Sequence, residues 1–375
     1  MKKQGKKIGL VKRLCKITAI ILAAVMVLFL IVVFIGRGVN AMRFGIKNGI
    51  QEEAFVTLGG IEQVIHIRGK DAGNPVIIWL HGGPGWSDAY ELAPWQYKME
   101  DDYTFIRWDQ RGSGRTVQRN PNAPISLDIL IADLDALVDY AAARFGQAVV
   151  IVGDSWGSFL GITYASWYPE KIAGFVGVAQ PINGAESDRR ALVIAYERAM
   201  AAGNTGDAAQ MRVLYERIKD KNFLNVDDAD IGAYMEDLAL VQHLPAKYLA
   251  PRYESQGYGI FFSPWFGFHE IGELLSVFIV DNNLFLDRNR PLLYAMDEFV
   301  PPERLEIPVA FIMGSEDYIT NTALVAEYYV RVEAPSKNMF IVEGAGHSPY
   351  RLRPEEFVAK LREALAGFGI SSMKG

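Results

Sequence analysis

The chain has 375 residues, half of them hydrophobic, and a net charge of −6. This length allows a large buried core, whereas the acidic balance argues against nucleic acid as a partner. The only cysteine is Cys15, so internal disulfides are excluded. The sequence has no metal-ligand spacing, phosphate-binding loop or dinucleotide fingerprint, so we expect neither a metal nor a cofactor.

The N-terminal segment predicts a membrane anchor. Residues 17–35 form a run of 19 residues without a charge, and at about 1.5 Å per helical residue this run nearly crosses a bilayer core of about 30 Å. Residues 1–16 hold seven basic and no acidic side chains. The positive-inside rule therefore places residues 1–16 in the cytoplasm and the remainder outside it.

A cleaved signal peptide is the alternative interpretation of this segment, with a weak cleavage site at residues 39–41. We favour a single-pass anchor in the cell membrane, because the apolar run is longer than a signal peptide requires. A tether over residues 36–50 would then connect the anchor to the rest of the chain.

The first part of the predicted globular core covers residues 51–182. Strands over 54–58 and 63–68 are joined by a Gly-Gly turn, which predicts an antiparallel pair. The apolar strand 75–80 leads into the glycine-rich loop HGGPG at residues 81–85. Glycines let backbone amides approach a ligand, and we expect Gly83 to present its N–H there, with Gly82 as the alternative.

The pentapeptide GDSWG at residues 153–157 predicts a nucleophile. It follows an apolar strand at 148–152 and precedes a helix, which is the setting in which G-x-S-x-G exposes a serine on a sharp turn. Ser155 is therefore the candidate nucleophile. The N–H groups of Trp156 and Gly83 are the candidate donors to the oxyanion that forms when a carbonyl is attacked.

Residues 183–300 predict a helical cap. Residues 188–202 and 207–221 have the periodicity of amphipathic helices. The aromatic stretch 258–268 is interpreted either as pocket lining or as ordinary core of the cap. No substrate-binding residue is assigned, although four cap glutamates are candidates by composition: Glu197, Glu216, Glu236 and Glu254.

The second core part, residues 301–375, supplies the candidate acid and base. A strand over 308–313 is followed by Asp317, our candidate acid, with the adjacent Glu316 as its competitor. His347 lies in a glycine-rich turn after the strand at 339–342 and is the candidate base. The order serine, aspartate, histidine is the order used by α/β-hydrolases. Four other histidines are considered less suitable: His66, His81, His243 and His269.

Three motifs together resemble an α/β-hydrolase of the proline iminopeptidase type. They are HGGPG at 81–85, WDQRGSGRT at 108–116 and GDSWGS at 153–158, and the resemblance covers roughly residues 51–182 and 301–370. The resemblance implies structural roles for Asp109 and Arg111. The Trp-Glu pair with which such enzymes bind a substrate amine is absent from this sequence. The alternation of predicted strands and helices along the chain predicts an α/β fold, with a mostly parallel sheet of eight strands and a helical cap inserted after the sixth.

The predicted function is therefore that of a membrane-anchored serine hydrolase, which the resemblance narrows to an aminopeptidase that releases N-terminal residues from small peptides or amides. An esterase or amidase acting on small apolar acyl substrates is the alternative, because the same three side chains serve either reaction. A surface binding protein that kept the fold without catalysis is an alternative of another class.

Overall fold

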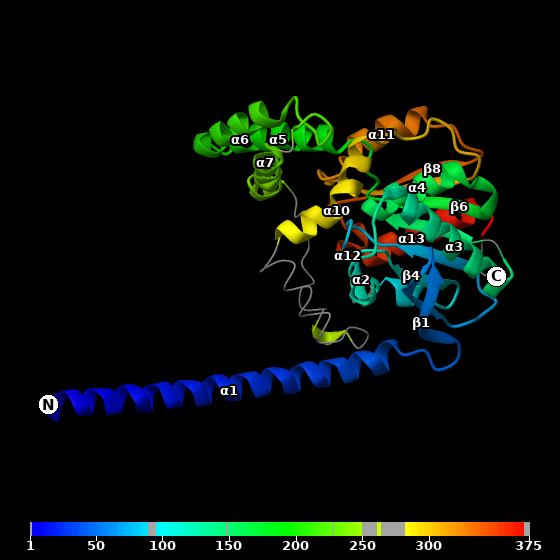
Figure 1. The fold of residues 1–375 in the computed structure, drawn as a ribbon. Coiled ribbons are helices and arrows are strands. Elements are labelled where there is room, and N and C mark those ends of the chain that lie inside the picture. Colours follow the sequence, from blue (N-terminus) through cyan, green and yellow to red (C-terminus); the bar gives the residue numbers. More distant parts are fainter. Residues whose placement is uncertain are drawn as a thin grey trace.

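A sheet with helices on both faces carries a projecting group of helices and one long N-terminal helix in the computed structural model (Figure 1). The structure describes residues 2–88, 95–147, 149–227, 229–249, 261–263 and 282–370.

The eight strands of the sheet follow the order β1-β2-β4-β3-β5-β6-β7-β8. The pairs β1–β2 and β2–β4 are antiparallel and the other neighbours are parallel. The predicted mostly parallel sheet of eight strands is thus confirmed. The strands are β1 Ile50–Leu58, β2 Ile61–Gly69, β3 Val76–Leu80, β4 Thr104–Asp109, β5 Val149–Asp154, β6 Ile172–Val178, β7 Val309–Gly314 and β8 Lys337–Val342.

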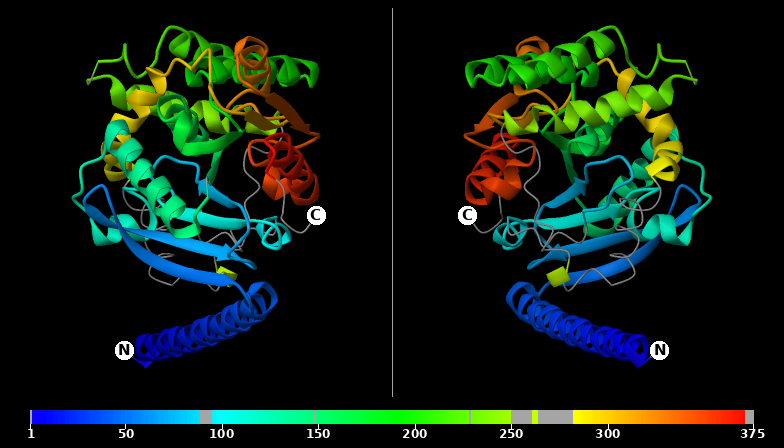
Figure 2. Two further views of the ribbon diagram at one scale, coloured as in Figure 1. Left: turned by 90° about the vertical axis from the view of Figure 1, so that its right-hand side faces the viewer. Right: turned by 90° about the vertical axis from the view of Figure 1, so that its left-hand side faces the viewer.

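The central strands are buried on both faces because helices cover both. In β5, Ile151 belongs to a core shared with α3 (Leu127–Phe145), α4 (Trp156–Trp167) and α11 (Thr322–Arg331). Its neighbour Val150 faces the opposite core, which includes α12 (Pro349–Leu352) and α13 (Pro354–Gly367). Figure 2 shows α3 and α13 on opposite sides of the sheet. The short helix α2 spans Gly114–Arg119.

Helices are inserted between β6 and β7, as predicted for a cap after the sixth strand. Within the described residues they include α5 (Gly184–Ala201), α6 (Thr205–Ile218), α7 (Ile231–His243) and α10 (Asn282–Asp297). The first three share a small apolar core of their own, which includes Leu192, Leu214 and Tyr234. This separate core explains how α5–α7 project from the sheet in Figure 1.

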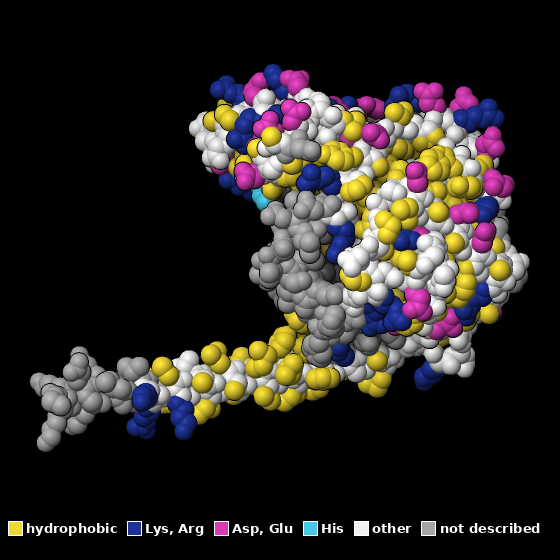
Figure 3. Space-filling model, in the orientation of Figure 1, with side chains coloured by type: hydrophobic (Ala, Val, Ile, Leu, Met, Phe, Trp, Pro, Cys, Tyr) yellow, Lys and Arg dark blue, Asp and Glu magenta, His cyan; other side chains and the backbone are white. Residues whose placement is uncertain are grey.

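The N-terminal helix α1 (Lys2–Phe44) is long and apolar enough to cross a membrane over Lys12–Phe44, by length and composition. Figure 3 shows hydrophobic side chains along it. The helix continues to Phe44, so most of the segment predicted as a tether is helical. Its end is fixed to the sheet, because Arg68 donates a hydrogen bond to the carbonyl of Phe44 (2.6 Å).

Candidate active site

Ser155 lies on a sharp turn between β5 and α4. Its backbone is at φ 51° and ψ −117°, a region that non-glycine residues rarely adopt. The flanking glycines permit the turn: a Cβ at Gly153 would overlap the carbonyl of Gly157, and a Cβ at Gly157 would overlap that of Leu80. Glycine is therefore needed two residues before and two residues after Ser155, because neighbouring backbone leaves no room for a side chain at either position.

The fold brings together the three side chains predicted from separate motifs. Ser155 Oγ lies 3.0 Å from His347 Nε2. His347 Nδ1 lies 3.0 Å from one carboxylate oxygen of Asp317 and 3.2 Å from the other. With the proton assigned to Nδ1, the imidazole donates to Asp317 and its Nε2 accepts from the serine hydroxyl.

Asp317 is held as a carboxylate by several donors. Its oxygens accept hydrogen bonds from the backbone N–H of Ile319 (2.9 Å) and Thr320 (3.2 Å) and from the Thr320 hydroxyl (2.7 Å). Burial opposes ionisation of Asp317, but His347 and these donors outweigh it, and the pKa of Asp317 lies below its usual value. Burial likewise opposes protonation of His347, yet the Asp317 carboxylate raises the pKa of His347 above its usual value.

The competing acid Glu316 makes different contacts. Its carboxylate accepts a hydrogen bond from the Tyr318 hydroxyl (2.5 Å) and pairs with Arg198 of α5 at 3.4 Å. Glu316 therefore connects the loop after β7 to the inserted helices, and Asp317 is the acid that contacts His347.

Three of the other four histidines have contacts or exposure that argue against a role beside Ser155. His66 lies on β2, 3.7 Å from Glu53. His81 is buried, and its Nε2 lies 3.0 Å from the Ser113 hydroxyl. His243 is exposed at the end of α7, and His269 lies outside the described residues.

The HGGPG loop lies beside the nucleophile. A Cβ placed on Gly82 would be 3.5 Å from the Cβ of Ser155, and Gly83 has φ 139°, which favours glycine. Trp156 is the first residue of α4, and the first amides of a helix have no carbonyl partner within it. The loop and the helix start thus bring the two candidate donors, Gly83 and Trp156, to the neighbourhood of Ser155.

Gln110 links this loop to the turn of the nucleophile. Its side-chain amide donates to the carbonyl of His81 (3.2 Å) and accepts from the indole N–H of Trp156 (2.9 Å). Burial lowers the pKa of His81, which keeps its imidazole neutral. Gln110 lies within the WDQRGSGRT motif, but the motif predicts no role for it, because a sequence pattern does not show which distant groups a side chain joins.

Replacing Gln110 with leucine is expected to slow acylation of Ser155 about 100-fold, because a small displacement of positioned groups has effects of this size. The second-order rate of Ser155 labelling by a fluorophosphonate measures this. The matched control is Gln63→Leu, because Gln63 makes the same two kinds of hydrogen bond. Its side-chain amide donates to the carbonyl of Leu58 and accepts from the indole N–H of Trp108.

Gln63 lies on β2, which β4 and β3 separate from β5. Both variants should lose stability in a denaturant titration, but only Gln110→Leu should lose labelling rate. Equal losses of rate in the two variants would show that Gln110 acts through stability alone.

Asp109 and Arg111, predicted to be structural, make buried contacts around the same loop. Asp109 accepts from the Ser87 hydroxyl (2.5 Å) and from the backbone N–H of Arg115 (2.9 Å). Arg111 forms a two-bond pair with the buried Asp133 (2.7 and 2.9 Å). These contacts fix the loop after β4 in place.

A buried carboxylate for which the GDSWG motif predicts no role lies next to the nucleophile. Asp154 is 6% exposed and accepts a hydrogen bond from the Tyr350 hydroxyl (2.9 Å). Its other oxygen has no hydrogen-bond partner within the described part of the chain. Burial raises the pKa of Asp154 to about 6.

Replacing Asp154 with asparagine is expected to stabilise the fold at neutral pH. The pKa of Asp154 is higher in the folded chain than the unfolded value of about 3.9. The folded state therefore binds the proton more tightly, and stability is lost as pH rises between these two values. Asparagine removes the charge and retains an acceptor for Tyr350.

Denaturant titrations in detergent at two pH values measure this effect. The gain in free energy of unfolding should be about 2 kcal/mol larger at pH 7.5 than at pH 4. A gain that is independent of pH would contradict the assignment of a raised pKa to Asp154.

The four cap glutamates that were substrate-binding candidates by composition alone gain little support from the described structure. Glu197, Glu216 and Glu236 are exposed, and Glu254 lies outside the described residues. Of the aromatic stretch 258–268, the structure describes residues 261–263, and Phe261 contacts α1.

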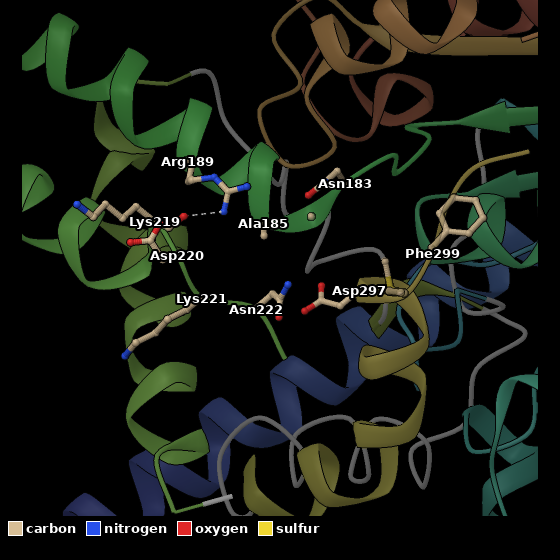
Figure 4. Close-up of a pocket in the computed structure, with 11 residues that line it drawn as sticks. Asn183, Ala185, Arg189, Lys219, Asp220, Lys221, Asn222, Asp297 and Phe299 are labelled. Atoms are coloured by element: carbon tan, nitrogen blue, oxygen red, sulfur yellow. Dashed lines mark hydrogen bonds between the residues drawn. The ribbon is translucent and has the colours of Figure 1, made fainter. Parts of the chain in front are cut away.

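A cavity of about 200 Å³ lies where the inserted helices join the sheet (Figure 4). Asn183 and Ala185 line it at the start of α5, and Asp297 and Phe299 line it at and just after the end of α10. Arg189 donates a hydrogen bond to the carbonyl of Lys219 at its edge (3.1 Å). Ser155, Asp317 and His347 are not among its lining residues, so we do not assign substrate to it.

Comparison with known proteins agrees with the fold and with the geometry around Ser155. Residues 77–360 match the alpha/beta hydrolase family. The chain belongs to the α/β hydrolase family. Relatives of this family member include the "Probable aminopeptidase YbaC" of Bacillus subtilis, 24% identical over 330 residues that cover 84% of this chain and 96% of the relative. Proline iminopeptidase PfmaB of Pestalotiopsis fici is 24% identical over 83% of this chain and 98% of the relative.

The predicted resemblance to proline iminopeptidases is thus confirmed at the level of the α/β hydrolase family and its named relatives. Among solved structures, a membrane phospholipase A described as a bacterial virulence factor has a TM-score of 0.55 and 16% identity, and the match covers 96% of this chain and 99% of that one. At this identity the likeness shows the fold alone.

Proposed function

We propose that this α/β hydrolase is a serine hydrolase that acts through an acyl-enzyme. The observation that carries the proposal is the hydrogen-bonded series Ser155, His347 and Asp317, with 3.0 Å between serine and histidine and 3.0 Å between histidine and aspartate. A nucleophile, a base and an orienting acid in this geometry are what activation of a serine hydroxyl requires.

In the first step, His347 Nε2 takes the hydroxyl proton as Ser155 Oγ bonds to the substrate carbonyl carbon. The N–H groups of Gly83 and Trp156 stabilise the oxyanion, and Asp317 stabilises the imidazolium. The imidazolium then gives its proton to the leaving amine or alcohol as that bond breaks. Water repeats the sequence on the acyl-enzyme, which releases the acid and regenerates Ser155.

Within this reaction class we favour a proline iminopeptidase-like aminopeptidase. The aminopeptidase and proline iminopeptidase names of relatives that match along most of their length support this assignment. The exposure of the three described cap glutamates favours the second candidate, an esterase or amidase for small apolar acyl groups, because a solvated carboxylate binds an amine weakly.

Hydrolysis of prolyl-2-naphthylamide and N-acetylprolyl-2-naphthylamide distinguishes the two candidates, because these substrates differ only in the free amine. An aminopeptidase should cleave only the first. Equal cleavage of both, with faster turnover of p-nitrophenyl butyrate, would exclude the aminopeptidase and retain the hydrolase. A chain that a fluorophosphonate does not label at Ser155 would instead be the non-catalytic binding protein.

The proposed placement is a single pass through the cell membrane, with residues 1–16 in the cytoplasm, 17–35 in the bilayer and the catalytic part outside. The basic tail and the length of α1 support it. Protease treatment of intact cells should remove the catalytic part and protect the tail. Release of a chain that lacks α1 into the medium would favour the signal peptide.

A further inference from the structure

The inserted segment 261–263 contacts the C-terminal half of α1. Arg37 donates a hydrogen bond to the carbonyl of Phe261 (2.8 Å), and Asn40 donates one to the carbonyl of Phe262 (2.9 Å). The ring of Phe261 lies against that of Phe29, with centroids 5.4 Å apart and the planes at 79°. The contact residues recur along one side of the helix, where Val33 is fully buried.

The fit between the segment and the helix depends on a glycine. A Cβ at Gly36 would overlap the ring of Phe262, whereas a Cβ at Gly38, on the same helix, meets no atom within 4 Å. The segment thus packs on one particular face of α1.

The contacts place this segment at a definite level relative to the proposed membrane span. Arg37 follows the apolar run 17–35, whereas Phe29 lies inside the run. Phe29 precedes the end of the run by six residues, or about 9 Å of helix. The carbonyl of Phe261 is therefore close to the level of the headgroups, and its ring points toward the hydrocarbon. Aromatic rings are enriched at this boundary.

The orientation of the remaining helices is compatible with this level if α1 is tilted. Figure 1 shows α5–α7 extending in the direction of the N-terminal end of α1, and Figure 3 shows charged side chains on them. If α1 were perpendicular to the membrane, the charges on α5–α7 would lie toward the bilayer. A tilt of α1 moves them away from it, and membrane helices commonly tilt by about 20° and up to about 40°.

We infer that Phe261 forms a lipid-contacting surface and that its ring enters the outer boundary of the bilayer beside α1. The inference rests on the membrane anchor that forms part of the proposed function. Its consequence is that the anchor positions part of the insertion, through Arg37, Asn40 and Gly36, in addition to holding the chain at the membrane.

Fluorescence quenching in phosphatidylcholine vesicles tests this surface. The full chain carries Cys15→Ser, to remove the only native thiol, and Phe261→Cys labelled with the environment-sensitive dye NBD. The matched control label is at Val213→Cys, because Val213 is 56% exposed on α6. The label at 261 should emit at shorter wavelength and lose more fluorescence to 5-doxyl phosphatidylcholine than the label at 213.

Two further variants test the role of α1. Gly36→Leu should displace the segment and reduce quenching at 261, whereas Gly38→Leu should leave it unchanged. A label at 261 that is quenched no more than the label at 213, or equal quenching in both glycine variants, would overturn the inference.

Crosslinking of the unmodified chain by a diazirine-bearing phosphatidylcholine gives the same test without substitutions, and should modify the peptide that contains Phe261. Lack of adducts on that peptide would also overturn the inference. Alkaline carbonate separates this failure from failure of the anchor, because an unanchored chain would be released from the vesicles. Neither readout depends on hydrolysis by Ser155.

Discussion

Replacing Ser155 with alanine is expected to lower kcat by about 10⁴- to 10⁶-fold, the range found when a serine nucleophile is removed. Alanine keeps the Cβ and removes only the hydroxyl that lies 3.0 Å from His347. Turnover of the best substrate from the naphthylamide and ester comparison, together with covalent labelling by a fluorophosphonate, measures the effect.

Ser336→Ala is the matched control, because Ser336 is a half-buried serine in the turn before β8. It should retain activity and labelling. Denaturation midpoints of both variants should remain close to that of the parent chain. Retention of near-full hydrolysis by Ser155→Ala would refute the assignment of the nucleophile.

Replacing Asp317 with asparagine is expected to lower kcat/KM by about 10⁴-fold, because the amide no longer orients and stabilises the imidazolium. The variant should also have a different pH profile. His347 must be neutral to accept a proton, so activity rises with pH through the pKa of His347. Asp317 raises the pKa of His347, and the rising limb should therefore move to lower pH when the carboxylate is lost.

Glu316→Gln provides the control at the adjacent position. Glu316 contacts Tyr318 and Arg198, so this change should leave the rising limb of the pH profile where it is in the parent chain. If Glu316→Gln shifted the rising limb of the pH profile and Asp317→Asn did not, Glu316 rather than Asp317 would be the acid that orients His347.

The strands were predictable because burial on both faces leaves a continuous apolar run. The strand predicted at 308–313 corresponds to β7, Val309–Gly314, and the hairpin residues 54–58 and 63–68 lie within β1 and β2. Each assignment needed only the local composition and the turn residues at its ends. The end of α1 was harder to predict, because the glycines and polar residues that follow the apolar run resemble a linker.

The contacts of Gln110 and Asp154 were not predictable from the same patterns. Gln110 joins His81 to Trp156, two residues that lie 75 positions apart in the sequence. Asp154 is adjacent to Ser155, but its burial beneath Tyr350 depends on a helix almost two hundred residues later. No local pattern specifies such pairs.

The sequence by itself determined the kind of fold and the order of the strands along the chain. It also singled out Ser155, His347 and the loop at Gly83, since these lie in turns that require glycine after apolar strands. Only the tertiary structure decided that Asp317 rather than Glu316 contacts His347, and that Phe261 packs on α1. Neighbouring side chains in a loop point in directions set by whatever packs around them, and those partners come from distant parts of the chain.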